Sequence, residues 1–164
     1  MGDDIAETLC PIARAEPIVG DRWTALVLNE LMLGTCRFEE LQIQTGAAPN
    51  MLTSRLKRLE RDQLVERKLY RIRPDRYEYH PTAKGRAFGQ VLLALRAWSE
   101  TWCKAENEPV AIDAIHNRCG GLAGLGPQCA TCGSTLLSED LQLRPGKDFE
   151  VERNARTDAF KVRR

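Results

Sequence analysis

The chain has 164 residues and a mass of 18.5 kDa, enough for one ordinary domain or for a domain of about 100 residues with a short appendage. Hydrophobic residues make up 43% and charged residues 29%, as is typical of globular proteins. No run approaches the roughly 18 apolar residues of a membrane-spanning helix. These values exclude a large catalytic barrel, a disordered chain and a membrane span. The opening Met-Gly-Asp-Asp is acidic where a secretory signal is basic, so we expect a cytoplasmic protein. Its six cysteines are then expected to be reduced, metal-bound or reactive.

The net charge of +1 hides an uneven distribution of charge along the chain. Residues 55–76 contain nine basic and four acidic side chains, whereas the first ten residues contain three acidic side chains and no basic one. A local basic patch in a neutral protein is compatible with a nucleic-acid partner.

The N-terminal half is predicted to be helical. From residue 12 to residue 33 apolar side chains recur at steps of three and four, which predicts a helix with a break near Gly20. Asp21 is a suitable N-cap for its second part, and a further short helix is predicted from Phe38 to Thr45, closing at Gly46.

A second short helix is predicted to begin at Pro49, where the missing N–H of proline costs nothing. Leu52, Leu56 and Leu59 form one apolar stripe along it. The opposite face is polar and basic, with Asn50, Thr53, Ser54, Lys57, Arg58 and Arg61.

A β-hairpin and a long helix are predicted to follow. Residues 65–70 and 77–80 have strand-like composition, and the tip between them is basic, with Arg71, Arg73 and Arg76. Thr82 is a good N-cap for a helix to about Lys104. Its apolar stripe contains Phe88, Val91, Leu92, Leu95, Trp98 and Trp102.

Two short helices followed by a basic hairpin form the order of a winged helix-turn-helix. A helix of this kind fits the major groove and presents polar side chains to base edges, while cations hold the phosphates. The wing arginines would reach an adjacent backbone or a narrow minor groove. The alternative is that the basic face is merely solvated.

Several short sequence motifs resemble those of the HxlR-type family of winged helix-turn-helix regulators, within the MarR-like superfamily. They are Cys10-Pro-Ile-Ala-Arg14, Ile18-Val-Gly-Asp-Arg-Trp23, Arg37-Phe-Glu-Glu-Leu41, Pro49-Asn-Met-Leu52, Arg55-Leu-Lys-Arg-Leu-Glu60, Tyr77-Glu-Tyr79 and Thr82-Ala-Lys-Gly-Arg86. Their unbroken order from Leu9 to Trp102 is specific evidence for the resemblance, although each motif alone is weak evidence.

The resemblance implies a homodimer that binds an inverted-repeat operator through the helix from Pro49 to Arg61. The DNA-contacting candidates are then Asn50, Thr53, Ser54, Arg55, Lys57, Arg58, Arg71, Arg73 and Arg76. The long helix and the N-terminal helix would form the dimer interface, with Phe88, Val91, Leu95, Trp98 and Trp102. The alternative is that both tryptophans pack within the monomer.

Two positions depart from the pattern of the family. Ala48 stands where a serine often caps the reading helix, a loss of about 1 kcal/mol. Gln63 stands where a glycine often follows that helix, and it must tolerate a left-handed conformation if the geometry is kept.

Cys10 is a candidate redox sensor, because some members of this family sense oxidants through a cysteine at the matching Cys-Pro. A helix starting at Pro11 and the nearby Arg14 would favour its thiolate. The alternative is an inert thiol, and Cys36 and Cys103 are interpreted as packing residues.

The distal segment contains two knuckle-like motifs, His116-Asn-Arg-Cys119-Gly and Cys129-Ala-Thr-Cys132-Gly. Together they offer four ligands for one structural zinc, as in a zinc ribbon. The alternatives are a disulfide between Cys129 and Cys132, an unliganded loop, or His116 serving only at a helix end.

Catalysis is not expected from this sequence. The Cys-x-x-Cys spacing is that of thiol-disulfide oxidoreductases, but no strand-helix-strand pattern surrounds it, and phosphate-binding glycine motifs are absent.

The predicted fold is mainly helical, with a β-hairpin wing and a small zinc-ribbon-like module. Residues 1–110 would form the DNA-binding and dimerisation domain, residues 111–146 the cysteine-rich module, and residues 147–164 a polar tail with little to bury. The predicted function is a sequence-specific transcriptional repressor responsive to redox or a small effector. The alternative is a zinc- or thiol-dependent interaction or sensor protein without operator recognition.

Overall fold

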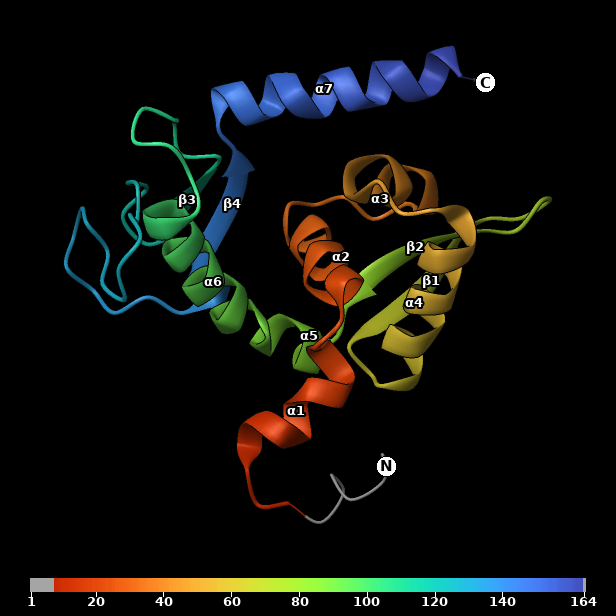
Figure 1. The fold of residues 1–164 in the computed structure, drawn as a ribbon, viewed down its shortest axis with the longest axis horizontal. Helices are drawn as coiled ribbons and strands as arrows, with labels where there is room; N and C mark the ends of the chain where they lie inside the picture. The colour runs from red at the N-terminus through yellow and green to blue at the C-terminus, as the bar shows by residue number, and fades with distance from the viewer. Residues whose placement is uncertain (1–7, 164) are drawn as a thin grey trace.

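The computed structural model describes residues 8–163 (Figure 1). The elements are α1 (Pro11–Val19), α2 (Arg22–Met32), α3 (Phe38–Thr45), α4 (Pro49–Arg61), β1 (Val65–Arg71), β2 (Arg76–Pro81), α5 (Ala83–Ala87), α6 (Gly89–Trp102), β3 (Ile112–His116), the 3-10 turn η2 (Ser138–Asp140), β4 (Leu141–Pro145) and α7 (Lys147–Val162). The predicted fold class, mainly helical with a small antiparallel hairpin, is confirmed. No helix in residues 8–163 is long and apolar enough to cross a membrane.

The main hydrophobic core lies between α2, α3 and α4. Leu52, Leu56 and Leu59 of the predicted stripe are each at most 1% exposed, and they pack with Leu28 and Leu41 in one cluster. Burial of this stripe determines which side of α4 turns away from the core.

The predicted helix boundaries hold in this region. The carboxylate of Asp21 accepts hydrogen bonds from the backbone N–H groups of Trp23 and Thr24, at 2.8 and 3.1 Å, and so caps α2. Helix α4 begins at Pro49 without a side-chain cap from Ala48. Gln63, at the position where the family often has glycine, has a φ of 59° and so adopts the left-handed conformation, as expected.

Strands β1 and β2 form the predicted wing, an antiparallel hairpin in which Val65 pairs with Pro81 and Leu69 with Tyr77. It is attached to the loop between α2 and α3, since the N–H of Tyr79 donates to the carbonyl of Cys36 at 2.8 Å. The tip is exposed and extends away from the core (Figure 1).

The long helix predicted after Thr82 is divided in two at Phe88. The Thr82 hydroxyl caps α5 as expected, by accepting from the N–H of Gly85. Glycine at position 89 weakens helix continuity. Phe88 packs against the main core, while α6 continues toward the C-terminal part of the chain. The prediction of one continuous helix was therefore wrong.

The C-terminal part has a small core of its own. Strands β3 and β4 pair antiparallel, and Ala114, Ala123, Cys129 and Leu136 are buried beside them. Arg96 fastens α6 to this part, because its guanidinium donates to the carbonyls of Ile112 at 2.6 and 3.0 Å and of Gly124 at 3.1 Å.

The segment expected to be a polar tail with little to bury is helix α7, which lies across α3 (Figure 1). Its packing is largely polar. Arg153 forms an ion pair with Glu30 at 2.8 Å, and the two side chains are 12% and 6% exposed. None of the residues of α7 is fully buried, as expected, but its docking on α3 was not predicted, because an interface made by arginine, glutamine and threonine has no apolar stripe in the sequence.

Candidate nucleic-acid interface and metal centre

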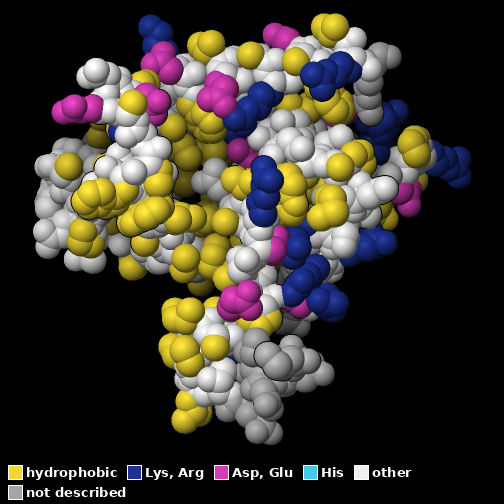
Figure 2. All heavy atoms as spheres, in the orientation of Figure 1, with side chains coloured by type: hydrophobic (Ala, Val, Ile, Leu, Met, Phe, Trp, Pro, Cys, Tyr) yellow, Lys and Arg dark blue, Asp and Glu magenta, His cyan; other side chains and the backbone are white. Residues whose placement is uncertain are grey.

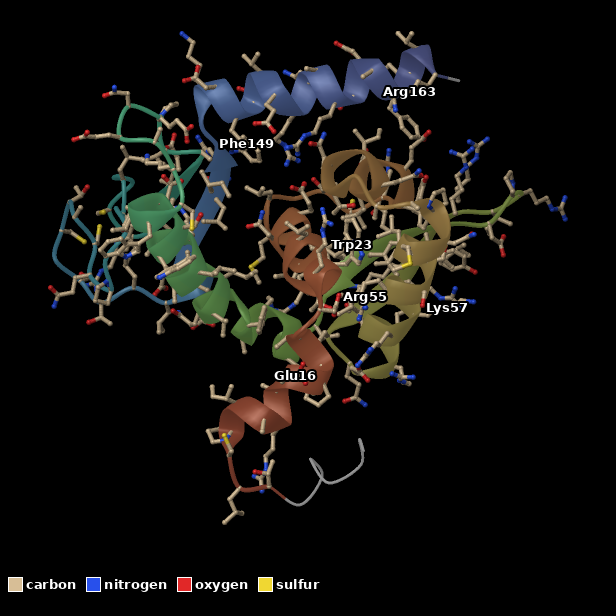
Figure 3. All side chains as sticks on the ribbon, in the orientation of Figure 1. Glu16, Trp23, Arg55, Lys57, Phe149 and Arg163 are labelled. Carbon is tan, nitrogen blue, oxygen red and sulfur yellow. The ribbon has the colours of Figure 1, made fainter. Side chains whose placement is uncertain are left out.

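The outward face of α4 is the candidate reading surface. Asn50, Thr53, Ser54 and Lys57 are all exposed, opposite the buried leucines. The Thr53 hydroxyl donates to the carbonyl of Pro49 at 2.8 Å, and Lys57 forms no ion pair with any residue in the range 8–163. This face therefore presents an amide, hydroxyls and an unpaired cation to solvent (Figure 3).

Arg55 and Arg58, also predicted to contact DNA, interact with other residues of the protein, Arg55 with its side chain 13% exposed and Arg58 with its side chain 39% exposed. Arg55 lies between α4 and α2, where it forms an ion pair with Asp21 at 2.8 Å (Figure 3). Arg58 donates to the carbonyl of Pro17 and lies 3.6 Å from Asp62. Both side chains hold α4 against the preceding helices.

The carboxyl group of Asp21 has a pKa below its usual value of 3.8. Partial burial alone would raise this pKa, but hydrogen bonds from the Thr24 hydroxyl and from two backbone N–H groups, together with Arg55, outweigh it. Asp21 therefore favours its ionised form and connects the cap of α2 to α4 through Arg55.

The wing arginines Arg71, Arg73 and Arg76 are exposed around the hairpin tip, and none forms an ion pair within residues 8–163. A hollow of about 620 Å³ separates the wing from α3 and is lined by Pro49 and Arg76. The start of α4 and the base of the wing tip thus border the same depression.

Helices α1 and α6 expose apolar side chains. Trp98 is 56% and Trp102 72% exposed, so the interpretation that both pack within the monomer was wrong. Val91 and Leu95 are about half exposed on the same helix. Phe88 differs, because it packs against the main core. The exposed large apolar residues on the two helices are Ile12, Val91, Leu95, Trp98 and Trp102, and Leu9, also exposed, directly precedes α1.

The four predicted metal ligands lie together. The ligand atoms of His116, Cys119, Cys129 and Cys132 are all within 4.8 Å of one another. The His116 Nδ1 lies 3.4 Å from the Cys119 Sγ and 3.3 Å from the Cys132 Sγ, and the Sγ atoms of Cys119 and Cys129 are 3.8 Å apart. All three cysteines are free thiols. His116 ends β3 and is 2% exposed, so the alternative that it serves only at a helix end is wrong.

These separations fit a tetrahedral ion. A Zn–S bond of about 2.3 Å places two sulfur ligands about 3.8 Å apart, and a Zn–N bond of about 2.0 to 2.1 Å places nitrogen and sulfur about 3.5 Å apart. Three sulfurs and one imidazole are also the donor types that zinc prefers. The cluster can therefore hold a metal ion.

Both knuckles turn backbone groups toward a sulfur. Gly120 and Gly133 have φ values of 69° and 73°, and each directly follows a ligand cysteine. Hydrogen bonds from the Ser134 side chain and backbone lower the pKa of Cys132 to about 6. The Gly121 N–H acts in the same direction on Cys119, but burial and the neighbouring thiols raise the pKa of Cys119 above its usual value.

The remaining cysteines differ in exposure. Cys10 is exposed directly before α1, and the Arg14 guanidinium donates to the Thr8 carbonyl. Cys36 is half-buried, and burial together with Glu78 raises its pKa. Cys103 is exposed, so its interpretation as a packing residue was wrong.

Sequence reasoning missed the contributions of Arg96 and α7. Arg96 interrupts the apolar stripe of α6, and an arginine in such a stripe indicates that its guanidinium has partners within the protein. For α7 the signal was the spacing of Phe149, Arg153, Arg156 and Phe160, which recur at steps of three and four and so lie on one helix face.

Comparisons with known proteins agree with this architecture. The family model described as HxlR-like helix-turn-helix matches residues 18–107. The HTH-type transcriptional regulator Rv3095 of Mycobacterium tuberculosis is 31% identical over 142 residues, which cover 86% of this chain and 89% of that protein.

Two solved structures are also similar. PA1607, described as a transcription factor, superposes with a TM-score of 0.65 at 30% identity, covering 82% of this chain and 93% of that one. The reduced form of the redox regulator HypR gives a TM-score of 0.51 at 29% identity, covering 56% and 92%. The chain therefore belongs to the HxlR-like helix-turn-helix family and is a transcriptional regulator of the helix-turn-helix type.

Proposed function

We propose that this protein is a repressor that binds an inverted-repeat operator as a homodimer. The observation that carries the proposal is the exposed face of α4, where Asn50, Thr53, Ser54 and Lys57 lie opposite the buried leucines. The wing supports it, because its three arginines form no ion pair within residues 8–163 and Arg76 lines the same hollow as Pro49 at the start of α4. In this arrangement α4 enters the major groove and reads base edges, while Arg71, Arg73 and Arg76 hold flanking phosphates. Arg55 and Arg58 position α4 from within the protein.

Dimerisation is supported by the apolar faces of α1 and α6. Exposed tryptophans on one helix are typical of interface cores, because they bury a large area at a small cost in side-chain entropy. In a twofold dimer formed through Trp98 and Trp102, each copy would supply one reading helix, and the two helices would bind the two half-sites of the inverted repeat in successive major grooves.

The cysteine-rich module is proposed to hold one structural zinc through His116, Cys119, Cys129 and Cys132. Only four residues form the buried core of this part of the chain, which is little for independent stability. The bound ion would supply ligand bonds in place of a larger core.

Cys10 is proposed to be a redox-sensing thiol. Cys10 is exposed and lies next to the exposed apolar residues Leu9 and Ile12, which supports a position at the proposed dimer face, where modification would change how the two copies meet. The likeness to the redox regulator HypR supports this role. Mild hydrogen peroxide should release DNA from the wild-type protein and not from Cys10→Ser, with Cys36→Ser as a control that behaves like wild type. Equal release from Cys10→Ser would exclude the role.

The central experiment selects duplexes from a random DNA pool with the full chain and then measures Kd against salt. Removal of one phosphate contact per chain lowers the slope of log Kd against log salt by about 0.9, or by about 1.8 for a dimer. We expect this loss for Lys57→Ala if Lys57 holds a phosphate, and no change for Lys147→Ala, a cation at the far end of α7.

The same experiment distinguishes the proposed repressor from the main alternative, a zinc- or thiol-dependent interaction protein without operator recognition. Enrichment of an inverted repeat supports the proposal. If no duplex is enriched, or if simultaneous removal of Lys57 and the wing arginines leaves Kd unchanged, the assignment of α4 as the reading helix is wrong.

A further inference from the structure

We infer that the C-terminal end of α7 is a second DNA-backbone contact, with Arg163 holding a phosphate beside the start of the reading helix. This inference rests on the proposed function, because it adds a contact to the same protein–DNA interface. The segment concerned is the one that the sequence predicted to be a polar tail.

Helix α7 is held at a defined position on the helix-turn-helix. Arg153 pairs with Glu30 of α2 at 2.8 Å, and the Arg156 guanidinium donates to the carbonyl of Gln44, at the end of α3, at 2.9 Å. The side-chain amide of Gln44 donates in return to the carbonyl of Arg153 at 3.2 Å. These contacts lie along one face of α7 and set its direction.

The same face continues to Arg163. Phe149, Arg153, Arg156, Phe160 and Arg163 are spaced by four, three, four and three residues, so they form a single stripe along the helix. Because the earlier members of the stripe contact α2 and α3, the last member lies over the element that follows, the start of α4. A hollow of about 700 Å³ confirms this placement, since Arg163 and Pro49 both line it.

Pro49 lines two hollows, and each of them is also lined by an arginine. It shares the first with Arg163 and the second with Arg76 of the wing, where Glu39, Glu40 and Asp75 are further lining residues. Figure 2 shows Lys and Arg side chains along the edge that runs from the end of α7, past α4, to the wing. A phosphate backbone that follows the groove read by α4 would pass the start of this helix, where Arg163 and Arg76 each line a hollow with Pro49.

The charge along α7 is polarised toward this end. Its first six residues include Asp148, Glu150 and Glu152, whereas residues 153–163 carry four basic side chains and one acidic one. Arg153, Arg156 and Lys161 each lie in an ion pair. Arg163 is exposed and has no ion pair within residues 8–163, so its charge is available to a phosphate.

The alternative is that Arg163 only complements the negative end of its own helix dipole. Such a role changes the stability of α7 and leaves the salt dependence of DNA binding unchanged. The two roles are therefore distinguished by measuring thermal unfolding and DNA binding on the same variants.

The test uses the full chain and a duplex that the wild-type protein has selected from a random pool. Arg163→Ala should lower the slope of log Kd against log salt by about 0.9 per chain, and Arg163→Lys should keep most of it. Lys147→Ala removes the same charge at the opposite end of α7 and should leave the slope unchanged. Hydroxyl-radical footprints should lose protection at flanking sugars in Arg163→Ala alone.

The outcomes separate this inference from the proposed function. If the wild-type protein selects a duplex and Lys57→Ala lowers the slope, an unchanged slope and footprint for Arg163→Ala overturn the role of α7 only. Equal slope losses for Arg163→Ala and Lys147→Ala also overturn it, because they indicate a general charge effect. If no duplex is selected, both the proposed function and this inference are wrong.

Discussion

The ion pair between Arg153 and Glu30 determines whether α7 stays on the helix-turn-helix, and Arg153→Met tests it. The paired nitrogen and oxygen are 2.8 Å apart, and the side chains are 12% and 6% exposed. Thr35 completes the group, since its hydroxyl donates to Glu30 and accepts from Arg153, both at 3.0 Å. Methionine keeps much of the volume of arginine but leaves the carboxylate of Glu30 without its cation.

Removal of one partner of a buried ion pair typically costs about 3 to 5 kcal/mol, because an uncompensated charge remains buried. Here the loss has an upper limit. Glu30 regains water if α7 leaves α3, so the cost cannot exceed the free energy that docks α7. We therefore expect Arg153→Met to lower the free energy of unfolding by about 3 kcal/mol, or to release α7 at a smaller cost.

Urea unfolding followed by the fluorescence of Trp23, which packs against the main core, measures the first outcome. Limited trypsin digestion of the folded protein measures the second, because a released α7 exposes cleavage sites such as Arg156. In Glu30→Met/Arg153→Met, part of the stability should return, since no unpaired charge remains.

Lys161→Met is the matched control, because its ion pair with Asp158 is about 70% exposed on both sides and should contribute less than about 1 kcal/mol. If Arg153→Met changes neither the urea midpoint nor the rate of trypsin cleavage, the reasoning that this pair docks α7 is refuted.

Three further predictions concern other parts of the chain. Asp21→Asn should lower the melting temperature at pH 7. The difference in melting temperature from wild type should shrink as the pH falls below about 4, because the pKa of Asp21 is lowered in the folded protein and its stabilisation is lost on protonation. A difference that grows in acid would contradict this reasoning. Protein purified without added metal should contain about one zinc per chain, and Cys129→Ser should lose the metal while Cys36→Ser keeps it; less than about half an equivalent in the wild type counts against the site. Trp98→Ala should weaken the dimer by about 2 kcal/mol or more, roughly 30-fold in sedimentation equilibrium, and a wild-type monomer at micromolar concentration would exclude this interface.

Local signals in the sequence were sufficient to predict the helix-turn-helix, the wing and the four residues of the His/Cys cluster. The stripe of Leu52, Leu56 and Leu59 predicts α4, because periodic burial is a property of one segment. Asp21, Pro49 and Thr82 mark helix starts for the same reason, since a cap acts within its own turn.

Tertiary structure alone decided which cations are free. Arg55 and Lys57 are two residues apart on α4, yet only the fold shows that Arg55 pairs with Asp21 and that Lys57 faces solvent. Whether Trp98 is covered within the monomer, and what α7 rests on, likewise depend on segments distant in sequence. The net charge of +1 could not identify a binding partner, because the position of each charge relative to its neighbours depends on packing.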